Sequence, residues 1–580
     1  MYTVLHKPRI LKNKNKGGIT MIHHRDLTQP LSLSGASGTG PIQTKYPEYR
    51  DYLPPCNHAC PAGENIQHWL QLAQEGAFEE AWQSLIENNP LPAVHGRACY
   101  HPCENACNRN QVDEPVSIHA VERHLGELAL RNGWQPRPPA PATGKKILVV
   151  GAGPSGLSCA WHLKRMGHEV EIRDAGPMPG GMMHFGIPAY RLPRAVLEQE
   201  IQRIVDYGVT LTLNHKVEDV LKEKAEGGFD AVFMAIGAHI GKRVDIPARD
   251  SGKILDAVSF LGSVDKGNPP KLGRRVAVYG GGNSAMDAAR TAKRLGAEDA
   301  MIIYRRDEAR MSAHAFEAEE AREEGVRINW LRTIKEMDEQ SITVEIMRVN
   351  EHGELVGTGE LETLEADSLI LALGQEVDTQ VLKAIPGLEH TDAGMVQVDR
   401  AMMTSVAGLF AGGDMIPAER SITQATGHGK KAARHIDAWL KGQTYQKPTQ
   451  APIIDYTGLH LWFNTDATSS KQPVRRPDER TQFDEIVGGL SDEAARYEAA
   501  RCYSCGNCFE CDGCYGACPE GAVIKLGKGS RYMFDYDKCT GCEACYNQCP
   551  CHAIDMVTPA ESRPAESISL SEGFDQESAR

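Results

Sequence analysis

Two runs of cysteine near the carboxyl end of the chain share the pattern C-x2-C-x2-C-x3-C-P. Three thiolates at this spacing can bind three irons of one 4Fe–4S cluster from a single loop, and the fourth reaches a second cluster. The runs consist of Cys508, Cys511, Cys514 and Cys518, and of Cys539, Cys542, Cys545 and Cys549. The pattern therefore predicts two clusters that carry single electrons, the first completed by Cys549 and the second by Cys518.

Two alternatives to this assignment stay open. Zinc sites also use C-x2-C pairs, but zinc does not account for the third cysteine of each run or for the paired C-P endings. A shifted register would use Cys502, Cys505 and Cys508 and would lose the C-P ending. Cys551 also falls outside both runs, so Cys502, Cys505 and Cys551 receive no role.

A nucleotide-binding fingerprint occupies residues 146–174, which read KILVVGAGPSGLSCAWHLKRMGHEVEIRD. A β-branched run, a glycine turn, a helical stretch, a second strand and an acid follow one another. Such a turn lets the backbone approach a pyrophosphate at a helix N-terminus, and the acid hydrogen-bonds a ribose. The residues expected to bind a dinucleotide here are Gly151, Gly153, Gly156 and Asp174.

Residues 275–306 repeat this pattern, with alanine in place of the third glycine. The expected binding residues are Gly280, Gly282, Asn283 and Ala285. The second strand ends in Arg305 and Arg306 instead of an acid, and guanidinium groups bind a 2′-phosphate that a carboxylate would repel. This favours NADPH over NADH. A solvated basic turn is the alternative, because Asp307 and Glu308 follow directly.

A third segment, 404–437, completes the middle of the chain. A strand ending in Gly413 and Asp414, followed by a helix from about Ser421, would place Asp414 on a ribityl chain and a helix N-terminus against a flavin. The arrangement resembles flavoproteins with two dinucleotide-binding domains. Between residues 141 and 500 the chain has only Cys159, so no redox disulfide can form there. Electrons would therefore leave the flavin through the cysteine clusters at the ends.

The amino-terminal cysteines are Cys56, Cys60, Cys99, Cys103 and Cys107. Around and after them, further motifs occur in order: CPAGENIQHWL, GRACYHPCENAC, GAGPSG, GGMMHFGIPAYRLP, GGGNSAMDAARTAKRLGA and YRR. Together they resemble the glutamate synthase small-subunit family, which includes the amino-terminal part of dihydropyrimidine dehydrogenase, over about residues 50–445. The last part of the chain resembles a bacterial two-cluster ferredoxin.

This resemblance implies FAD on the first fingerprint, with Gly181 as a further cofactor contact, and NAD(P)H on the second. It also implies one 4Fe–4S cluster on Cys60, Cys99, Cys103 and Cys107. Family members with two such clusters carry a C-x2-C-x4-C run before the C-P cysteine, and here only Cys56 remains of that run. We therefore expect one amino-terminal cluster, three clusters in all, and no role for Cys56.

The expected fold is multidomain α/β. It comprises an α-helical iron–sulfur domain, two Rossmann-like domains with the NAD(P) domain inserted in the FAD domain, and an α+β ferredoxin domain. The expected boundaries are a flexible segment 1–50, the iron–sulfur domain 51–140, the FAD domain 141–270 and 366–445, the NAD(P) domain 271–365, a linker 446–500, the ferredoxin domain 501–556 and a disordered tail 557–580.

Composition limits the class of function. The formal net charge of −14 argues against nucleic acid as a partner, and no apolar run approaches the length of a membrane span. The basic residues before Met21, which could itself be the true start, are not followed by the apolar core of a signal peptide. A reducing cytoplasm is the expected location.

The resulting hypothesis is an enzyme subunit that passes electrons between NAD(P)H, FAD, 4Fe–4S clusters and a protein partner. No general acid or nucleophile is identifiable, so no catalytic residue is assigned. The resemblance suggests three partners: a glutamate synthase large subunit, a 2-oxoacid oxidoreductase, or the sulfite reductase of sulfur-oxidising bacteria. A self-contained reductase and a non-catalytic iron–sulfur scaffold are the alternatives, and the direction of electron flow and homo-oligomerisation stay open.

Overall fold

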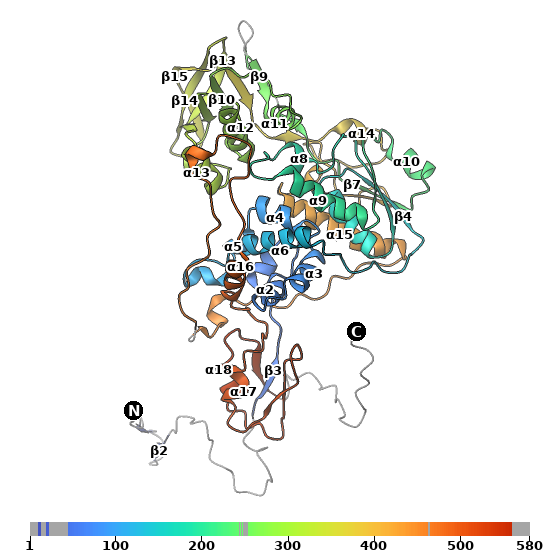
Figure 1. Cartoon of the computed structure of the whole chain (residues 1–580), viewed down its shortest axis with the longest axis vertical. Helices are drawn as coiled ribbons and strands as arrows, with labels where there is room; N and C mark the ends of the chain where they lie inside the picture. The colour runs from blue at the N-terminus through green and yellow to red at the C-terminus, as the bar shows by residue number, and fades with distance from the viewer. Residues whose placement is uncertain are drawn as a thin grey trace. The chain divides into compact units, whose positions relative to one another are not determined.

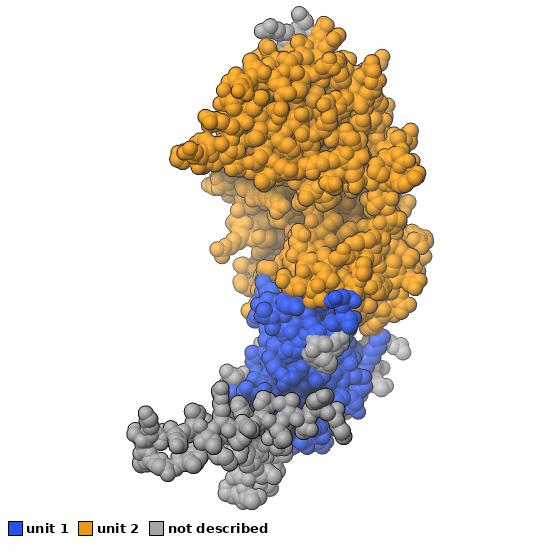
Figure 2. All heavy atoms as spheres, turned by 90° about the vertical axis from the view of Figure 1, so that its left-hand side faces the viewer, with its two compact units in different colours: residues 1–54, 450–466, 503–580 blue, residues 55–449, 467–502 orange. Residues whose placement is uncertain are grey.

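The computed structural model describes residues 10–12, 19–21, 44–242, 244, 246–247, 253–461 and 464–558. The chain divides into two compact units (Figure 2). Unit 1 contains residues 1–54, 450–466 and 503–580, and unit 2 contains residues 55–449 and 467–502. The tail expected beyond 557 lies outside the described residues from 559 onward.

The first nucleotide-binding domain of unit 2 is built on a parallel sheet whose strands run in the order β18-β7-β4-β5-β6. Figure 1 labels β4 and β7 of this sheet. These strands are Leu409–Ala411, Ala231–Met234, Lys146–Val150, Glu169–Arg173 and Thr210–Thr212. The central strands β4 and β7 are almost wholly buried, as a parallel sheet covered by helices on both faces requires. Its helices are α7 (Pro154–Arg165), α8 (Met182–Phe185), α9 (Arg194–Asp206), α10 (Val220–Glu226), α14 (Thr379–Lys383) and α15 (Ile422–Leu440).

The second, inserted domain has a parallel sheet in the order β12-β11-β10-β16-β9. Its strands are Arg327–Trp330, Asp299–Tyr304, Arg275–Tyr279, Ser368–Leu371 and Lys253–Asp256. An antiparallel meander β13-β14-β15 covers Arg332–Met337, Ser341–Val349 and Leu355–Glu365. The helices are α11 (Ala257–Asp265), α12 (Asn283–Arg294) and α13 (Ala315–Glu323). Because β9 and β16 belong to this sheet, the domain extends beyond the expected 271–365.

The two connections between these domains pair with each other. Strand β8 (Ile240–Gly241) runs antiparallel to β17 (Gln375–Glu376), so the inserted domain is joined by a two-stranded ribbon. The 3-10 turns η2 (Glu308–Arg310) and η3 (Gly413–Met415) lie at the ends of β11 and β18.

The amino-terminal part of unit 2 is helical, as the sequence predicts. Its elements are α1 (Pro55–Ala59), α2 (Ile66–Gln74), α3 (Phe78–Ile86), α4 (Pro92–Ala98), α5 (Pro102–Asn105), η1 (Asn108–Gln111) and α6 (Ile118–Asn132). Helices α4 and α6 cross at two glycines, where a Cβ on Gly96 would lie 2.5 Å from Arg123 N and one on Gly126 2.4 Å from Ala93 N. The crossing thus needs glycine on both helices.

Residues 467–502 return to unit 2, which differs from the expected linker over 446–500. They contain η6 (Pro477–Glu479) and helix α16 (Asp492–Ala500), which packs on α2 and α6. Ile486 N donates to Tyr190 O over 3.0 Å, and Arg480 Nη1 donates to Glu323 over 2.9 Å. The segment is polar, as a linker would be, but its polar groups form hydrogen bonds with the rest of unit 2.

Unit 1 takes a strand from far upstream. Strand β3 (Tyr46–Tyr49), within the segment expected to be flexible, pairs antiparallel with β21 (Ile554–Val557). The other elements are η4 (Tyr456–Gly458), α17 (Gly513–Ala517), β19 (Val523–Lys525), β20 (Tyr532–Phe534) and α18 (Ala544–Asn547). Strands β1 (Ile10–Lys12) and β2 (Ile19–Met21) form a separate antiparallel pair. Among the described residues, no helix is long and apolar enough to span a membrane.

We expect Glu498→Ala to destabilise unit 2 by about 3–5 kcal/mol, because it removes one of the two carboxylates that pair with buried Arg501 and leaves two backbone amides without an acceptor. The fully buried Glu498 carboxylate accepts hydrogen bonds from Ser117 N at 2.8 Å, Ser470 N at 2.7 Å and Arg501 Nη1 at 2.5 Å. Urea unfolding followed by far-ultraviolet circular dichroism measures the change. The exposed Glu493→Ala on the same helix is the control, and equal unfolding midpoints for the two variants would contradict the assignment.

Candidate functional site

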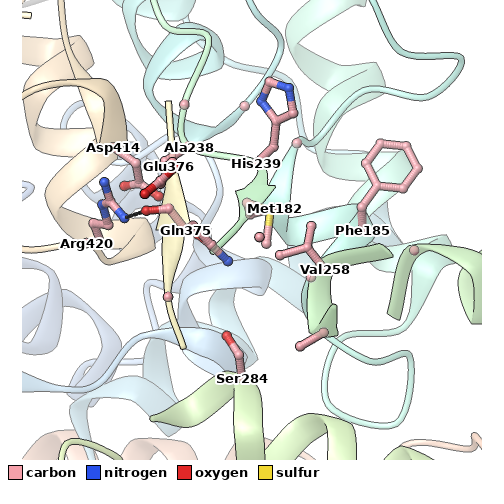
Figure 3. A pocket seen from close by; sticks show the side chains of 18 of the residues that line it. Met182, Phe185, Ala238, His239, Val258, Ser284, Gln375, Glu376, Asp414 and Arg420 are labelled. Carbon is pink, nitrogen blue, oxygen red and sulfur yellow. Dashed lines mark hydrogen bonds between the residues drawn. The ribbon is translucent and has the colours of Figure 1, made fainter. Parts of the chain in front are cut away.

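One cavity of about 1420 Å³ joins the two fingerprints. Its lining includes the predicted cofactor residues Gly151, Gly153, Asp174, Gly181, Gly280, Gly282, Asn283, Arg305, Arg306, Gly413 and Asp414. Gly156 and Ala285 are not in the lining, because both lie inside the helices that begin at it. Figure 3 shows Met182, Phe185 and Val258 among the side chains around this cavity.

The first fingerprint has the backbone geometry that a pyrophosphate needs. A Cβ on Gly156 would lie 1.9 Å from Gly151 O, and one on Gly151 would lie 2.4 Å from Ala235 O. These two glycines therefore allow the turn after β4 to contact both helix α7 and the chain that follows strand β7. A Cβ on Gly153 would meet nothing within 4 Å, so Gly153 faces open space at the start of α7, where free backbone amides favour an anion.

Asp174 directly follows strand β5, and backbone amides of the neighbouring turns hold its carboxylate. Its Oδ2 accepts from Ala152 N at 2.7 Å, and its Oδ1 accepts from Gly176 N at 2.7 Å. The carboxylate is thus oriented before any ligand binds, and each oxygen keeps a lone pair for a hydroxyl group.

The glycines of the second fingerprint are packed as closely as those of the first. A Cβ on Gly280 would lie 2.2 Å from Ala372 O, and one on Gly281 would lie 2.3 Å from the Tyr304 ring. Asn283 Oδ1 accepts from His314 N at 3.0 Å, which ties the start of α12 to the loop after η2. Gly281 was not singled out from the sequence because its partner, Tyr304, is distant along the chain.

The acids beside Arg305 and Arg306 are engaged elsewhere. Asp307 Oδ1 accepts from Arg310 N at 3.1 Å, and Glu308 pairs with Arg322. Both arginines line the cavity at the end of β11. Arg305 and Arg306 thus line the cavity while the acids that follow them pair with other residues.

Residues 404–437, the third segment singled out in the sequence, contribute polar groups to the lining of the cavity. Burial raises the pKa of Asp414 above its usual value, with Arg420 opposing the shift. Figure 3 shows Arg420 beside Asp414, donating to Gln375 O over 2.8 Å. Among the described residues, the buried Ser155 Oγ has no hydrogen-bond partner. An orphaned hydroxyl, a buried acid and the open face at Gly153 fit the polar chain of a dinucleotide such as FAD.

The cavity extends to residues on both sides of one amino-terminal cysteine. Ala98 and Tyr100 line it, so Cys99 lies between two lining residues. The Cys99 thiol accepts from Thr423 Oγ1 at 3.0 Å, and Thr423 lies beside the lining residue Ile422 at the start of α15. No sequence pattern predicted that Tyr100 would line the cavity or that Thr423 would bond to the Cys99 thiol.

The predicted amino-terminal ligands Cys60, Cys99 and Cys103 lie near one another. Burial raises the pKa of the Cys103 thiol, and the nearby Cys60, Cys99 and Cys56 thiols add to the rise. The pKa of Cys107 is also raised by burial, but its main further influences are backbone hydrogen bonds from Val116 and Arg109, which lower it. Hydrogen bonds to a thiolate tune the potential of an iron–sulfur cluster.

The Glu122 carboxylate, which the sequence did not single out, lies close enough to the Cys60 and Cys99 thiols to raise their pKa values, beyond the larger effect of burial. It is buried and accepts from Asn89 Nδ2 at 2.7 Å.

The ferredoxin cysteines fall into the two predicted sets. Cys508, Cys549 and Cys511 raise the pKa of Cys514, after burial. A small pocket is lined by all four predicted ligands of the second cluster, Cys518, Cys539, Cys542 and Cys545. Backbone amides donate to a sulfur of each set, with Ala522 N 3.2 Å from Cys518 Sγ and Ala553 N 3.2 Å from Cys549 Sγ. Cys551 Sγ lies 3.8 Å from Cys549 Sγ, beside the cluster ligands.

Three family models match the chain. Residues 145–430 match the pyridine nucleotide-disulphide oxidoreductases, residues 51–134 match dihydropyrimidine dehydrogenase domain II with its 4Fe-4S cluster, and residues 532–555 match a 4Fe-4S binding domain. The predicted fold class and the iron–sulfur flavoprotein character are thereby confirmed.

Among similar proteins, the NADP(+)-dependent formate dehydrogenase subunit beta of Moorella thermoacetica is 34% identical over 77% of this chain and 70% of its own length. The NADPH-Fe(3+) oxidoreductase subunit beta of Geobacter sulfurreducens is 32% identical over 78% and 75%. The glutamate synthase [NADPH] small chain of Escherichia coli is 32% identical over 67% and 89%. This chain belongs to the family of NADPH-dependent iron–sulfur flavoprotein oxidoreductases that includes the glutamate synthase small chains.

Proposed function

We propose that this chain takes hydride from NADPH onto FAD and passes single electrons through 4Fe–4S clusters to a separate catalytic subunit. The observation that carries the proposal is the position of Cys99, flanked by Ala98 and Tyr100 of the cavity lining and bonded to Thr423. A cluster held by this thiolate would lie beside the bound flavin. Flavin and clusters supply the electron chemistry, and the protein supplies binding and position.

The residues of the chain have separate tasks in this scheme. The amides at Gly153 and the start of α7 would bind the pyrophosphate of FAD, and Asp174 would bind its ribose. Buried Asp414, at the start of η3, would accept from the ribityl hydroxyls. Arg305 and Arg306 would bind the 2′-phosphate of NADPH, since the neighbouring acids are paired elsewhere.

A protein partner fits both the ferredoxin domain and the relatives' names. Two of the relatives named above are beta subunits, of a formate dehydrogenase and of an NADPH-Fe(3+) oxidoreductase, and a third is the small chain of glutamate synthase. Because Cys511 is exposed, a first ferredoxin cluster bound by it would lie near the surface of unit 1. We therefore propose that this cluster hands electrons to, or takes them from, a catalytic subunit of such an enzyme.

Anaerobic titration with NADPH, and separately with NADH, tests the whole proposal. We expect NADPH to bleach the flavin absorbance and to produce the EPR signals of reduced clusters. Purified protein without flavin would instead support a non-catalytic scaffold. Bleaching without reduced clusters would mean that electrons normally enter from the clusters and leave as NADPH.

Removing the guanidinium groups of Arg305 and Arg306 should weaken the binding of NADPH but not that of NADH. Hydrogen bonds to charged groups contribute about 1.5–3 kcal/mol each, so the loss of two in Arg305→Ala with Arg306→Ala should raise KM for NADPH by about 100-fold or more. KM for NADH should hardly change. Both values are measured with ferricyanide as acceptor, and Arg310→Ala on the same turn is the control. An equal rise in KM for the two coenzymes would contradict the assignment.

Gly153→Ala should reduce FAD content without unfolding the domain. The added Cβ meets no protein atom within 4 Å but enters the space expected for the pyrophosphate. We expect loss of most flavin absorbance after gel filtration, with an unchanged circular dichroism spectrum. Gly516→Ala in unit 1, whose Cβ also meets nothing within 4 Å, is the control. Full flavin content in Gly153→Ala would place the pyrophosphate elsewhere.

A further inference from the structure

Strand β3 is joined to unit 1 by more than its pairing with β21. Directly after the strand, Arg50 N donates to Ala553 O over 3.2 Å. Within the strand, Pro47 O accepts from Tyr536 Oη over 3.0 Å. Ala553 N in turn donates to Cys549 Sγ, so one residue connects the end of β3 to a predicted cluster ligand. The side chains of β3 therefore keep fixed positions relative to the cysteine loops of the same unit.

The Tyr49 side chain of this strand lies beside the predicted ligands of the first ferredoxin cluster. Its Oη is 3.8 Å from Cys514 Sγ, within hydrogen-bond distance for sulfur. Burial raises the pKa of Tyr49, and the thiols of Cys514, Cys508 and Cys549 raise it further. Three of the four cysteines predicted to bind this cluster thus lie near one phenol group.

The ring of Tyr49 packs against two residues at strand β20. Its centroid lies 5.0 Å from that of Phe534, and the guanidinium carbon of Arg531 lies 5.8 Å from it. Both contacts involve the ring and not the hydroxyl group. Phenylalanine at this position would therefore preserve the packing and remove only the group that faces the sulfur.

The direction of the hydrogen bond follows from the chemistry of a cluster ligand. A cysteine that binds iron is a thiolate and has no proton to donate, so the phenol is the donor and Cys514 Sγ is the acceptor. Reduction by one electron makes the cluster more negative, and a hydrogen bond to a charged acceptor is the stronger one. The bond therefore stabilises the reduced cluster more than the oxidised cluster, which raises the midpoint potential.

We propose that the Tyr49 hydroxyl group donates a hydrogen bond to Cys514 and thereby raises the midpoint potential of the first ferredoxin cluster. Tyr49 acts through a cluster ligand and is thus a positioning residue. Cys511 of the same predicted set is exposed, so Tyr49 tunes the cluster that a redox partner can approach. The inference rests on the proposed function in taking these cysteines as ligands of an electron-transfer cluster.

Redox titration of the full chain, purified anaerobically and followed by EPR, tests the inference. At a fixed potential, we expect Tyr49→Phe to lower the ratio of reduced to oxidised first cluster about 10-fold, which equals a shift of about 59 mV. The titration steps of the other clusters should not move. Tyr46→Phe, on the same strand with its ring against Tyr536, is the control and should match the wild-type protein.

The sign of the shift separates a hydrogen bond from a merely structural role. A variant that only opened unit 1 to water would expose the cluster, and water would stabilise its reduced and more negative form. The midpoint potential would then rise instead of fall. An unchanged or raised potential in Tyr49→Phe would overturn the inference. Loss of iron from this variant alone would also overturn it, because the hydroxyl group would then be needed for binding of the cluster.

Iron, FAD and flavin bleaching by NADPH are measured on the same samples. Wild-type protein without clusters or without flavin would contradict the proposed function and this inference together. Wild-type protein that holds both, with the same cluster potentials as Tyr49→Phe, would contradict only the role given to Tyr49.

Discussion

The close approach of α7 and α15 is the contact on which the rest of unit 2 depends. A Cβ on Gly429 of α15 would lie 2.2 Å from Ser155 O, so only glycine permits this separation. Ser158 Oγ donates over 2.8 Å to Thr426 O, which holds the helices in register. The start of α15 is thereby placed beside the cavity, and Thr423 is brought to the Cys99 sulfur. One backbone contact therefore sets the spacing between the flavin site and the nearest cluster ligand.

The interior beside Cys60 is polar to a degree that is unusual for a buried site. Burial raises the pKa of Glu64 to about 7 and lowers that of Lys430 to about 7. Lys430 Nζ donates to Ala62 O at 2.7 Å and to Asn88 Oδ1 at 2.6 Å, so its hydrogen bonds are satisfied. Charges and dipoles held this close to thiolate ligands are the means by which a protein tunes cluster potential.

Residues 467–502 connect separate parts of unit 2 through hydrogen bonds. Glu485 receives hydrogen bonds from Arg97 of α4, and Gln482 O accepts from Arg294 of α12 over 3.1 Å. This one segment therefore contacts both the helical iron–sulfur part and the inserted nucleotide domain. Rigid-body rotation of the inserted domain, which a two-stranded ribbon alone would permit, is restrained by these contacts.

The sequence by itself determined the local parts of this protein: both glycine turns, the acid at Asp174 and the cysteine sets of the ferredoxin domain. Their signals are local because the turn, the helix N-terminus and three ligands of each cluster lie within a few residues of one another. Only the tertiary structure decided the pairing of β3 with β21 and the return of α16 to unit 2. Each of these depends on partners that are distant along the chain, and no residue pattern encodes such a contact.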